Sequence, residues 1–187
     1  ITIIIDRKQS MKTYESQINS SVRELASCMD PRTTLRIVSA GQIPALEYVG
    51  SPNGAKQFSV AGLKTGYANN VPMDLAVRLA ANDLINAEKK RAIIFISDGD
   101  ITQNSFDKYS LNEMTSYLNN NFISFLMIQV EQKAIDDSLD YLVKNTNGTE
   151  YFMFRPEGLS KIIKDIVDIP SGVYTFSYTS TLSTNFG

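Results

Sequence analysis

The feature that most constrains this chain is the alternation of short, mainly apolar runs with segments of helical period. Apolar runs of strand length lie at residues 1–6, 92–97 and 122–130. A strand that is apolar on both sides must be covered on both faces, which is typical of parallel sheets in α/β proteins. The alternation therefore predicts an α/β, doubly wound, mainly parallel sheet flanked by helices, with strand order 3-2-1-4-5-6.

Weaker runs complete this pattern. Residues 33–39 and 150–154 predict two further strands, and the shorter run at residues 57–63 predicts an edge strand. Residues 41–55 contain both proline and glycine and predict a turn. Apolar side chains at steps of three and four predict helices, which cover residues 10–29, 72–87, 111–120, 135–144 and 156–167.

The C-terminal part follows a different pattern. Between residues 173 and 182 the aromatic side chains of Tyr174, Phe176 and Tyr178 alternate with hydroxyl side chains. This alternation predicts a half-buried antiparallel strand, paired either with an edge of this sheet or with a neighbouring domain or protein copy. We therefore expect a domain at 1–169 and a β extension at 170–187 that joins it to another part of a larger protein.

The composition excludes several classes of function. The chain has 187 residues, no histidine and a single cysteine, Cys28. Histidine-based triads, imidazole-ligated zinc and an intrachain disulfide are therefore impossible. The net charge of -2 argues against a nucleic-acid partner, which would favour a basic excess. No apolar run approaches the roughly 18 residues of a membrane span.

Two predicted neighbouring strands end in a carboxylate. Asp6 follows the first apolar run and Asp98 follows the fourth strand. Because the carboxyl ends of parallel strands meet at one edge of the sheet, we expect these side chains to face each other across the crevice. Two buried carboxylates at close range require a cation, a proton or hydrogen-bond donors.

Three segments around these carboxylates resemble the motifs of the von Willebrand factor A family. Residues 3–11 (IIIDRKQSM) resemble its D-x-S-x-S-M motif after an apolar strand. Residues 71–80 (VPMDLAVRLA) are similar to its second motif, in which a threonine opens a helix. Residues 93–99 (IIFISDG) resemble its third, an apolar strand ending in (T/S)-D-G. The resemblance extends from residue 1 to about residue 167 and implies the fold of that family.

The resemblance also implies a site. The family's metal-ion-dependent adhesion site (MIDAS) holds Mg²⁺ or Mn²⁺ with two serines, one threonine and two aspartates, and a partner's carboxylate often completes the shell. Asp6, Ser10 and Asp98 match that pattern, whereas Lys8 replaces the first serine and Val71 replaces the threonine. Neither replacement offers a ligand oxygen. We therefore expect no cofactor and no tightly bound metal; any Mg²⁺ or Mn²⁺ would bind weakly at Asp6, Ser10 and Asp98.

Some assignments stay open on the sequence alone. The Lys8 ammonium either occupies the metal position, which leaves two aspartates and one lysine with a summed charge of minus one, or points to solvent. A shifted alignment would let Thr65, Asn69 or Asn70 supply an oxygen. Asp100 either contributes to the site or is a solvated acid that precedes Thr102.

The function that we expect is a non-catalytic protein-binding or adhesion module. Its partner would contact the crevice loops, with Arg7, Gln9, Tyr67, Asn69, Asn70 and Asp100 as candidate contact residues. The alternative is a Mg²⁺-dependent phosphoryl-transfer enzyme that uses Asp6, Asp98 and Asp100. The composition, rich in isoleucine, asparagine and lysine, suggests a bacterial protein, and we expect an extracytoplasmic place in the cell envelope or outside the cell.

Overall fold

The computed structural model describes residues 1–170 and Ser177, and these residues form one six-stranded sheet between two layers of helices. The strand order is β3-β2-β1-β4-β5-β6, which confirms the predicted order. Five strands are parallel and β3 is antiparallel to β2. The strands are β1 (Thr2–Asp6), β2 (Leu35–Ala40), β3 (Ala45–Gly50), β4 (Arg91–Ser97), β5 (Ile123–Gln129) and β6 (Glu150–Phe152).

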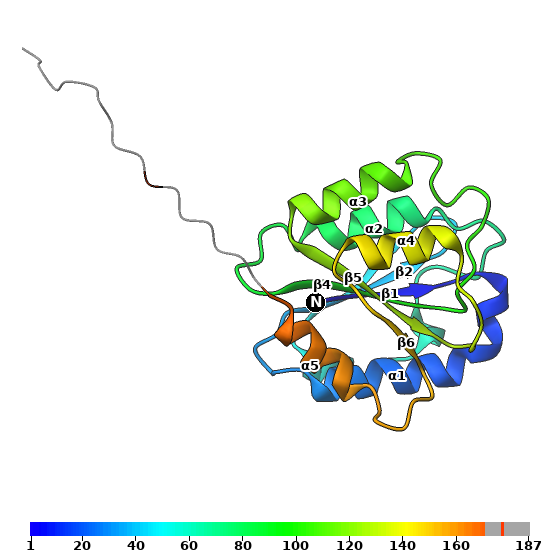
Figure 1. Ribbon diagram of the computed structural model, residues 1–187. Coiled ribbons are helices and arrows are strands. Elements are labelled where there is room, and N and C mark those ends of the chain that lie inside the picture. The colour runs from blue at the N-terminus through cyan, green and yellow to red at the C-terminus, as the bar shows by residue number, and fades with distance from the viewer. Residues whose placement is uncertain (171–176, 178–187) are drawn as a thin grey trace, which may run out of the picture.

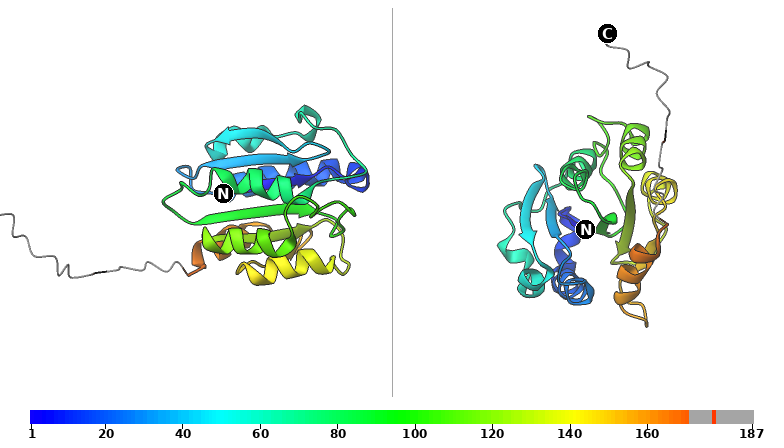
Figure 2. Two further views of the ribbon diagram at one scale, coloured as in Figure 1. Left: turned by 90° about the horizontal axis from the view of Figure 1, so that it is seen from above. Right: turned by 90° about the vertical axis from the view of Figure 1, so that its left-hand side faces the viewer.

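Helices cover both faces of the sheet (Figures 1 and 2). One face carries α1 (Glu15–Cys28) and α5 (Ser160–Asp168). The other carries α2 (Met73–Asn82), α3 (Leu111–Asn120) and α4 (Asp137–Asn145). Alternate residues of β1 enter the two core clusters, with Ile3 and Ile5 on the α1 side and Ile4 on the α2 side. The sheet is therefore buried on both faces, as its apolar strands require.

The edge strand differs from the one expected. Residues 57–63 are not a strand; they contain the end of the short 3-10 helix η2 (Pro52–Gln57) and all of η3 (Val60–Gly62). The edge strand is β3, inside the segment expected to be a turn. It returns directly from β2 as a hairpin, with an irregularity between Ile37 and Val38. Residues 57–63 pack against α1 instead, where the Asn19 side chain accepts the backbone N–H of Val60.

The helix boundaries also shift near the crevice. The predicted helix at residues 10–29 begins as a 3-10 helix, η1 (Gln9–Tyr14), and becomes α-helical at Glu15. The first turn of η1 is fixed by a contact with another loop, because the N–H of Gln9 donates to the carbonyl of Ala68. The helix expected over residues 72–87 ends earlier, at Asn82.

The predicted strand at residues 173–182 lies outside the described residues. Among the residues that the structure describes, no helix combines the length and apolarity needed to cross a bilayer.

Candidate functional site

Asp6 and Asp98 lie together at the carboxyl edge of the sheet because β1 and β4 are hydrogen-bonded neighbours. Both residues are buried, with exposed fractions of 1% and 3%. β1 is also the strand at which the chain order reverses, since β2 lies on its other side. The two carboxylates therefore occupy the position where open α/β sheets place their binding sites.

The ammonium group of Lys8 lies between these carboxylates. Its Nζ is 2.5 Å from Asp98 Oδ1 and 3.3 Å from Asp6 Oδ2, and it also donates to the backbone carbonyl of Asp100. Lys8 is only 7% exposed, so the expected contact is present and the solvent-pointing alternative is wrong. An ammonium has three hydrogens, and three acceptors surround it here.

Neutral donors complete the coordination of the two carboxylates. The Ser10 hydroxyl donates to Asp98 Oδ2 at 2.5 Å, and the Ser97 hydroxyl donates to Asp6 Oδ2 at 2.7 Å. The backbone N–H of Lys8 donates to Asp6 Oδ1, and that of Asp100 donates to Asp98 Oδ1, which also accepts from the Lys8 ammonium; each backbone hydrogen bond is 3.0 Å long. The role of Ser97 was not foreseen, although its place before Asp98 in the third motif could have indicated it.

The two aspartates differ in their acidity. Burial is the largest influence on Asp6 and raises its pKa to about 6, against the opposing effects of Lys8 and the Ser97 hydroxyl. Burial also opposes ionisation of Asp98, but hydrogen bonds from Lys8, Ser10 and the Asp100 N–H hold the pKa of Asp98 below its usual range. Asp98 is therefore the stable anion of the pair, and Asp6 is the member that takes up a proton as the pH falls.

Val71 provides no ligand to this cluster. Its side chain is 4% exposed and packs in the apolar cluster on the α2 side. Its backbone is fixed by Thr102, whose hydroxyl accepts from the Val71 N–H at 3.0 Å and is 3.1 Å from the Val71 carbonyl. Ser105 adds a hydroxyl contact to the same carbonyl at 3.3 Å. These hydroxyls join the loop after β4 to the start of α2, a role that the sequence did not reveal.

Asp74 holds the same loop from the other side. Its side chain, on the first turn of α2, is 1% exposed and accepts the N–H groups of Lys108 and Tyr109, each at 2.8 Å. The loop that carries Asp98 and Asp100 is thus tied to α2 through hydrogen bonds.

Arg7 is not on the surface, which corrects the expectation that it contacts a partner. It is 6% exposed, and its guanidinium stacks on the Tyr67 ring at 3.8 Å from the ring centre. Nε and Nη1 of Arg7 have no hydrogen-bond partner among the described residues. The Tyr67 hydroxyl donates to Glu15 at 2.6 Å. The stack ties the loop of Tyr67 to the end of β1, and cation–π contacts of this kind gain strength when they are shielded from water. The hydrogen bond to Glu15 ties the same loop to α1.

A polar groove of about 600 Å³ lies beside the crevice. It is formed by Gln9, by Gln42 and Ile43 of the β2–β3 connection, and by residues 64–70. Asn69 and Asn70 are exposed on it, as is Ile43 at 78%. The described hydrogen bonds of the Asp6 and Asp98 carboxylates come from Lys8, Ser10, Ser97 and Asp100, so the structure does not bring Thr65, Asn69 or Asn70 into the cluster.

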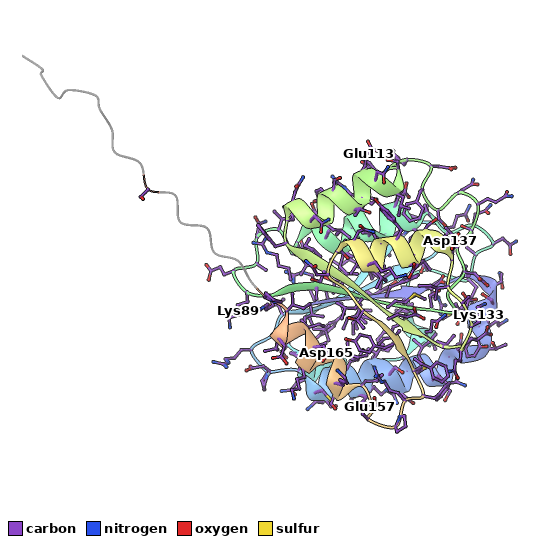
Figure 3. The ribbon with its side chains drawn as sticks, viewed as in Figure 1. Lys89, Glu113, Lys133, Asp137, Glu157 and Asp165 are labelled. Atoms are coloured by element: carbon purple, nitrogen blue, oxygen red, sulfur yellow. The ribbon has the colours of Figure 1, made fainter. Side chains whose placement is uncertain are left out.

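The carboxylate of Asp100 faces away from the other two aspartates. It is 61% exposed and pairs with Lys133 at 2.7 Å, and Lys133 also contacts Glu131 at 3.3 Å. Figure 3 shows Lys133 at the carboxyl end of the sheet, opposite Lys89. Among the described residues, no three acidic or cysteine side chains converge as a metal site would require. A divalent cation between Asp6 and Asp98 would have to displace the Lys8 ammonium, so the residues present do not fit Mg²⁺.

Solved structures of other proteins share this architecture. A von Willebrand factor type A structure from Catenulispora acidiphila superimposes on 89% of this chain with a TM-score of 0.68 and 14% identity, over 41% of its own length. Mussel byssus proximal thread matrix protein 1, with zinc in its MIDAS motif, matches 88% of this chain at a TM-score of 0.67 and 9% identity, over 44% of its length.

A third structure, an aerotolerance-related membrane protein of Bacteroides fragilis with multiple mutations to serines, has a TM-score of 0.66 at 15% identity. The match covers 89% of this chain and 96% of that one. No family model and no curated protein sequence matches the chain. The strand order, the two helix layers and these superpositions agree: the chain has the fold of von Willebrand factor A domains.

Proposed function

We propose that this chain is a non-catalytic protein-binding module of the von Willebrand A type that works without a divalent cation, because the Lys8 ammonium takes the place of the metal. One observation carries the proposal: Lys8 Nζ lies within ion-pair distance of both Asp6 and Asp98. A lysine in this position makes the site a degenerate adhesion site whose positive charge belongs to the chain itself.

The hydrogen-bonding capacity of Lys8 limits what a partner can do. The ammonium donates hydrogen bonds to Asp98 and to the backbone carbonyl of Asp100, and it forms an ion pair with Asp6. A partner's carboxylate, which often completes the metal shell in that family, would have to compete with these groups for the ammonium. It would also meet a cluster in which two aspartates outnumber one lysine. The partner therefore contacts the rim of the crevice rather than its centre.

The polar groove is the part of the rim best suited to this contact. It presents the amide side chains of Gln9, Asn69 and Asn70 next to the exposed Ile43. Amides donate and accept hydrogen bonds without the desolvation cost of a charge, and they are common in adaptable protein interfaces. Tyr67 anchors the groove wall through its contacts with Arg7 and Glu15.

The absence of catalysis in this proposal follows from the residues available. The sequence contains no histidine, and the Cys28 thiol is exposed at the end of α1. Asp98 accepts hydrogen bonds from Lys8, Ser10 and the Asp100 N–H, and Lys8 donates to Asp98 and to the Asp100 carbonyl, so neither is free to act as a nucleophile or base. An extracytoplasmic location is part of the same proposal, and fractionation of the source cells would test it.

A capture experiment tests the proposed function. The chain is immobilised and exposed to an extract of its source cells, once with EDTA and once with Mg²⁺. We expect the same bound proteins under both conditions, and we expect their loss from a variant with Asn69→Ala and Asn70→Ala. The control is Lys89→Ala, an exposed change at the opposite end of the molecule. Binding that requires Mg²⁺, or that the groove variant retains in full, would overturn the proposal.

A further inference from the structure

Arg7 carries a positive charge that the described part of the chain leaves unpaired. The residue is 6% exposed, and none of the ion pairs among the described residues includes it. Its Nε and Nη1 atoms are buried and have no hydrogen-bond partner there. A guanidinium keeps its proton in proteins, so Arg7 cannot lower this cost by becoming neutral. A buried charge of this kind is expensive unless an anion offsets it.

Two carboxylates near Arg7 in the structure are engaged elsewhere. Asp6 directly precedes it, but the Asp6 oxygens accept hydrogen bonds from Lys8 and Ser97. Successive residues of an extended segment also point to opposite faces of the sheet. Glu15 accepts the hydroxyl of Tyr67, the residue whose ring stacks on Arg7. The group that offsets the charge of Arg7 must therefore come from outside the described residues.

The backbone fixes Arg7 at the end of β2. The Arg7 N–H donates to the carbonyl of Ala40 at 3.0 Å, and the Arg7 carbonyl accepts the N–H of Ala68 at 2.8 Å. Thr65 packs at the same strand end, where a methyl group added to Gly41 would lie 2.9 Å from Thr65 Cβ. The Thr65 hydroxyl oxygen is also buried without a hydrogen-bond partner among the described residues. Two side chains with unused donors thus border this strand end.

The stack on Tyr67 restricts the shape of the missing anion. The ring takes one face of the guanidinium, 3.8 Å from Cζ, whereas the N–H groups of Arg7 lie along its edges. A carboxylate is planar and binds the edge of a guanidinium, so it can lie in the plane of the stacked group. The oxygens of a tetrahedral phosphate would project from that plane toward the ring. An in-plane carboxylate also leaves the stack intact, and with it the groove wall that Tyr67 forms.

We propose that Arg7 binds a small free carboxylate, of the size of formate or acetate, beneath the ring of Tyr67, with the Thr65 hydroxyl as a further donor. Because Arg7 is 6% exposed, the ligand enters when the Tyr67 ring swings out, and the ring then closes again over the ion pair. The site lies beside the polar groove but needs no protein partner, so its tests stand or fail independently of the proposed function.

Thermal unfolding in about 100 mM sodium formate, compared with sodium chloride at the same concentration, tests the site. Formate has so few atoms that its Kd is at best on the order of 1 mM. At that affinity formate should raise Tm by up to roughly 10 °C. The rise should vanish in Arg7→Met and persist in Arg78→Met, the matched control, since Arg78 stacks on Tyr117 at 3.7 Å but is only half-buried. Equal Tm values in the two salts would overturn the proposal, because water would then satisfy Arg7.

Nuclear magnetic resonance of the wild type keeps the proposal testable if Arg7→Met does not fold. Formate should move the Nε–H resonance of Arg7 and slow its exchange with water, and it should leave the resonance of Arg78 unchanged. A rise in Tm without a change at Arg7 would place formate elsewhere and overturn the proposal.

A capped aspartyl peptide distinguishes a free carboxylate from the side chain of another protein. The peptide is too large to be enclosed beneath Tyr67, so it should leave both Tm and the Arg7 resonance unchanged. Tighter binding of the peptide than of formate would refute a small free ligand.

Discussion

Replacement of Lys8 by methionine removes the ammonium but keeps an unbranched apolar stem. Asp6 and Asp98 would remain buried at 1% and 3% exposure and would lose the cation that contacts both. Removal of one partner from a buried ion pair costs about 3–5 kcal/mol, because it leaves an uncompensated charge. For a domain of this size, we expect Tm to fall by roughly 6–20 °C at neutral pH.

The assay is calorimetric unfolding of Lys8→Met beside a matched variant, Lys133→Met. Lys133 also pairs with an aspartate, at 2.7 Å, but in a pair exposed to water by 35% and 61%. Such pairs contribute at most about 1 kcal/mol, and salt screens them. The deficit of Lys8→Met should persist at high salt and should shrink near pH 5, where Asp6 can take up a proton. Equal losses of stability in the two variants would refute the view that Lys8 neutralises a buried charge cluster.

Two further predictions concern protons and metal. Burial raises the pKa of Asp6 from its ordinary 3.8 to about 6, so between these values the folded state holds a proton that the unfolded state releases. The contribution of Asp6 to stability is therefore full below pH 4 and falls by on the order of 3 kcal/mol as the pH rises through about 6. The free energy of unfolding, measured by urea titration at several pH values, should therefore fall with pH more steeply for the wild type than for Asp6→Asn. Parallel pH dependences of the two proteins would contradict this. The double change Lys8→Ser with Val71→Thr restores two oxygen ligands and should produce Mg²⁺ binding by calorimetry, whereas the unmodified chain should give no such heat.

The sequence predicted those parts of the molecule that depend on periodicity and on chain order. The apolar runs of β1, β4 and β5 indicated a sheet buried on both faces, and the order of the elements placed Asp6 beside Asp98. The contact between Lys8 and these carboxylates could also be expected, since a lysine two residues after a buried aspartate has both the reach and the charge to meet them.

Other features depend on tertiary contacts that a local pattern does not record. β3 was missed because the glycine and proline residues around it are typical of a turn. A short strand is nevertheless enough to form a hairpin with β2. Arg7 was placed on the surface because charged loop residues are usually solvated. Its burial depends on Tyr67, which is sixty residues away in the chain and stacks on its guanidinium. The link from Thr102 to the backbone of Val71 is equally non-local.

The stack of Arg7 on Tyr67 connects the cluster around Lys8 with the polar groove. Lys8 lies in the centre and directly follows Arg7 in the chain, while Tyr67 belongs to the loop that forms the groove. A divalent ion enters and leaves according to its concentration, so an ion-dependent site reports on the surrounding medium. A lysine joined to the backbone cannot diffuse away. On the proposed function, the groove would therefore be ready to bind as soon as the protein folds, whatever ions surround it.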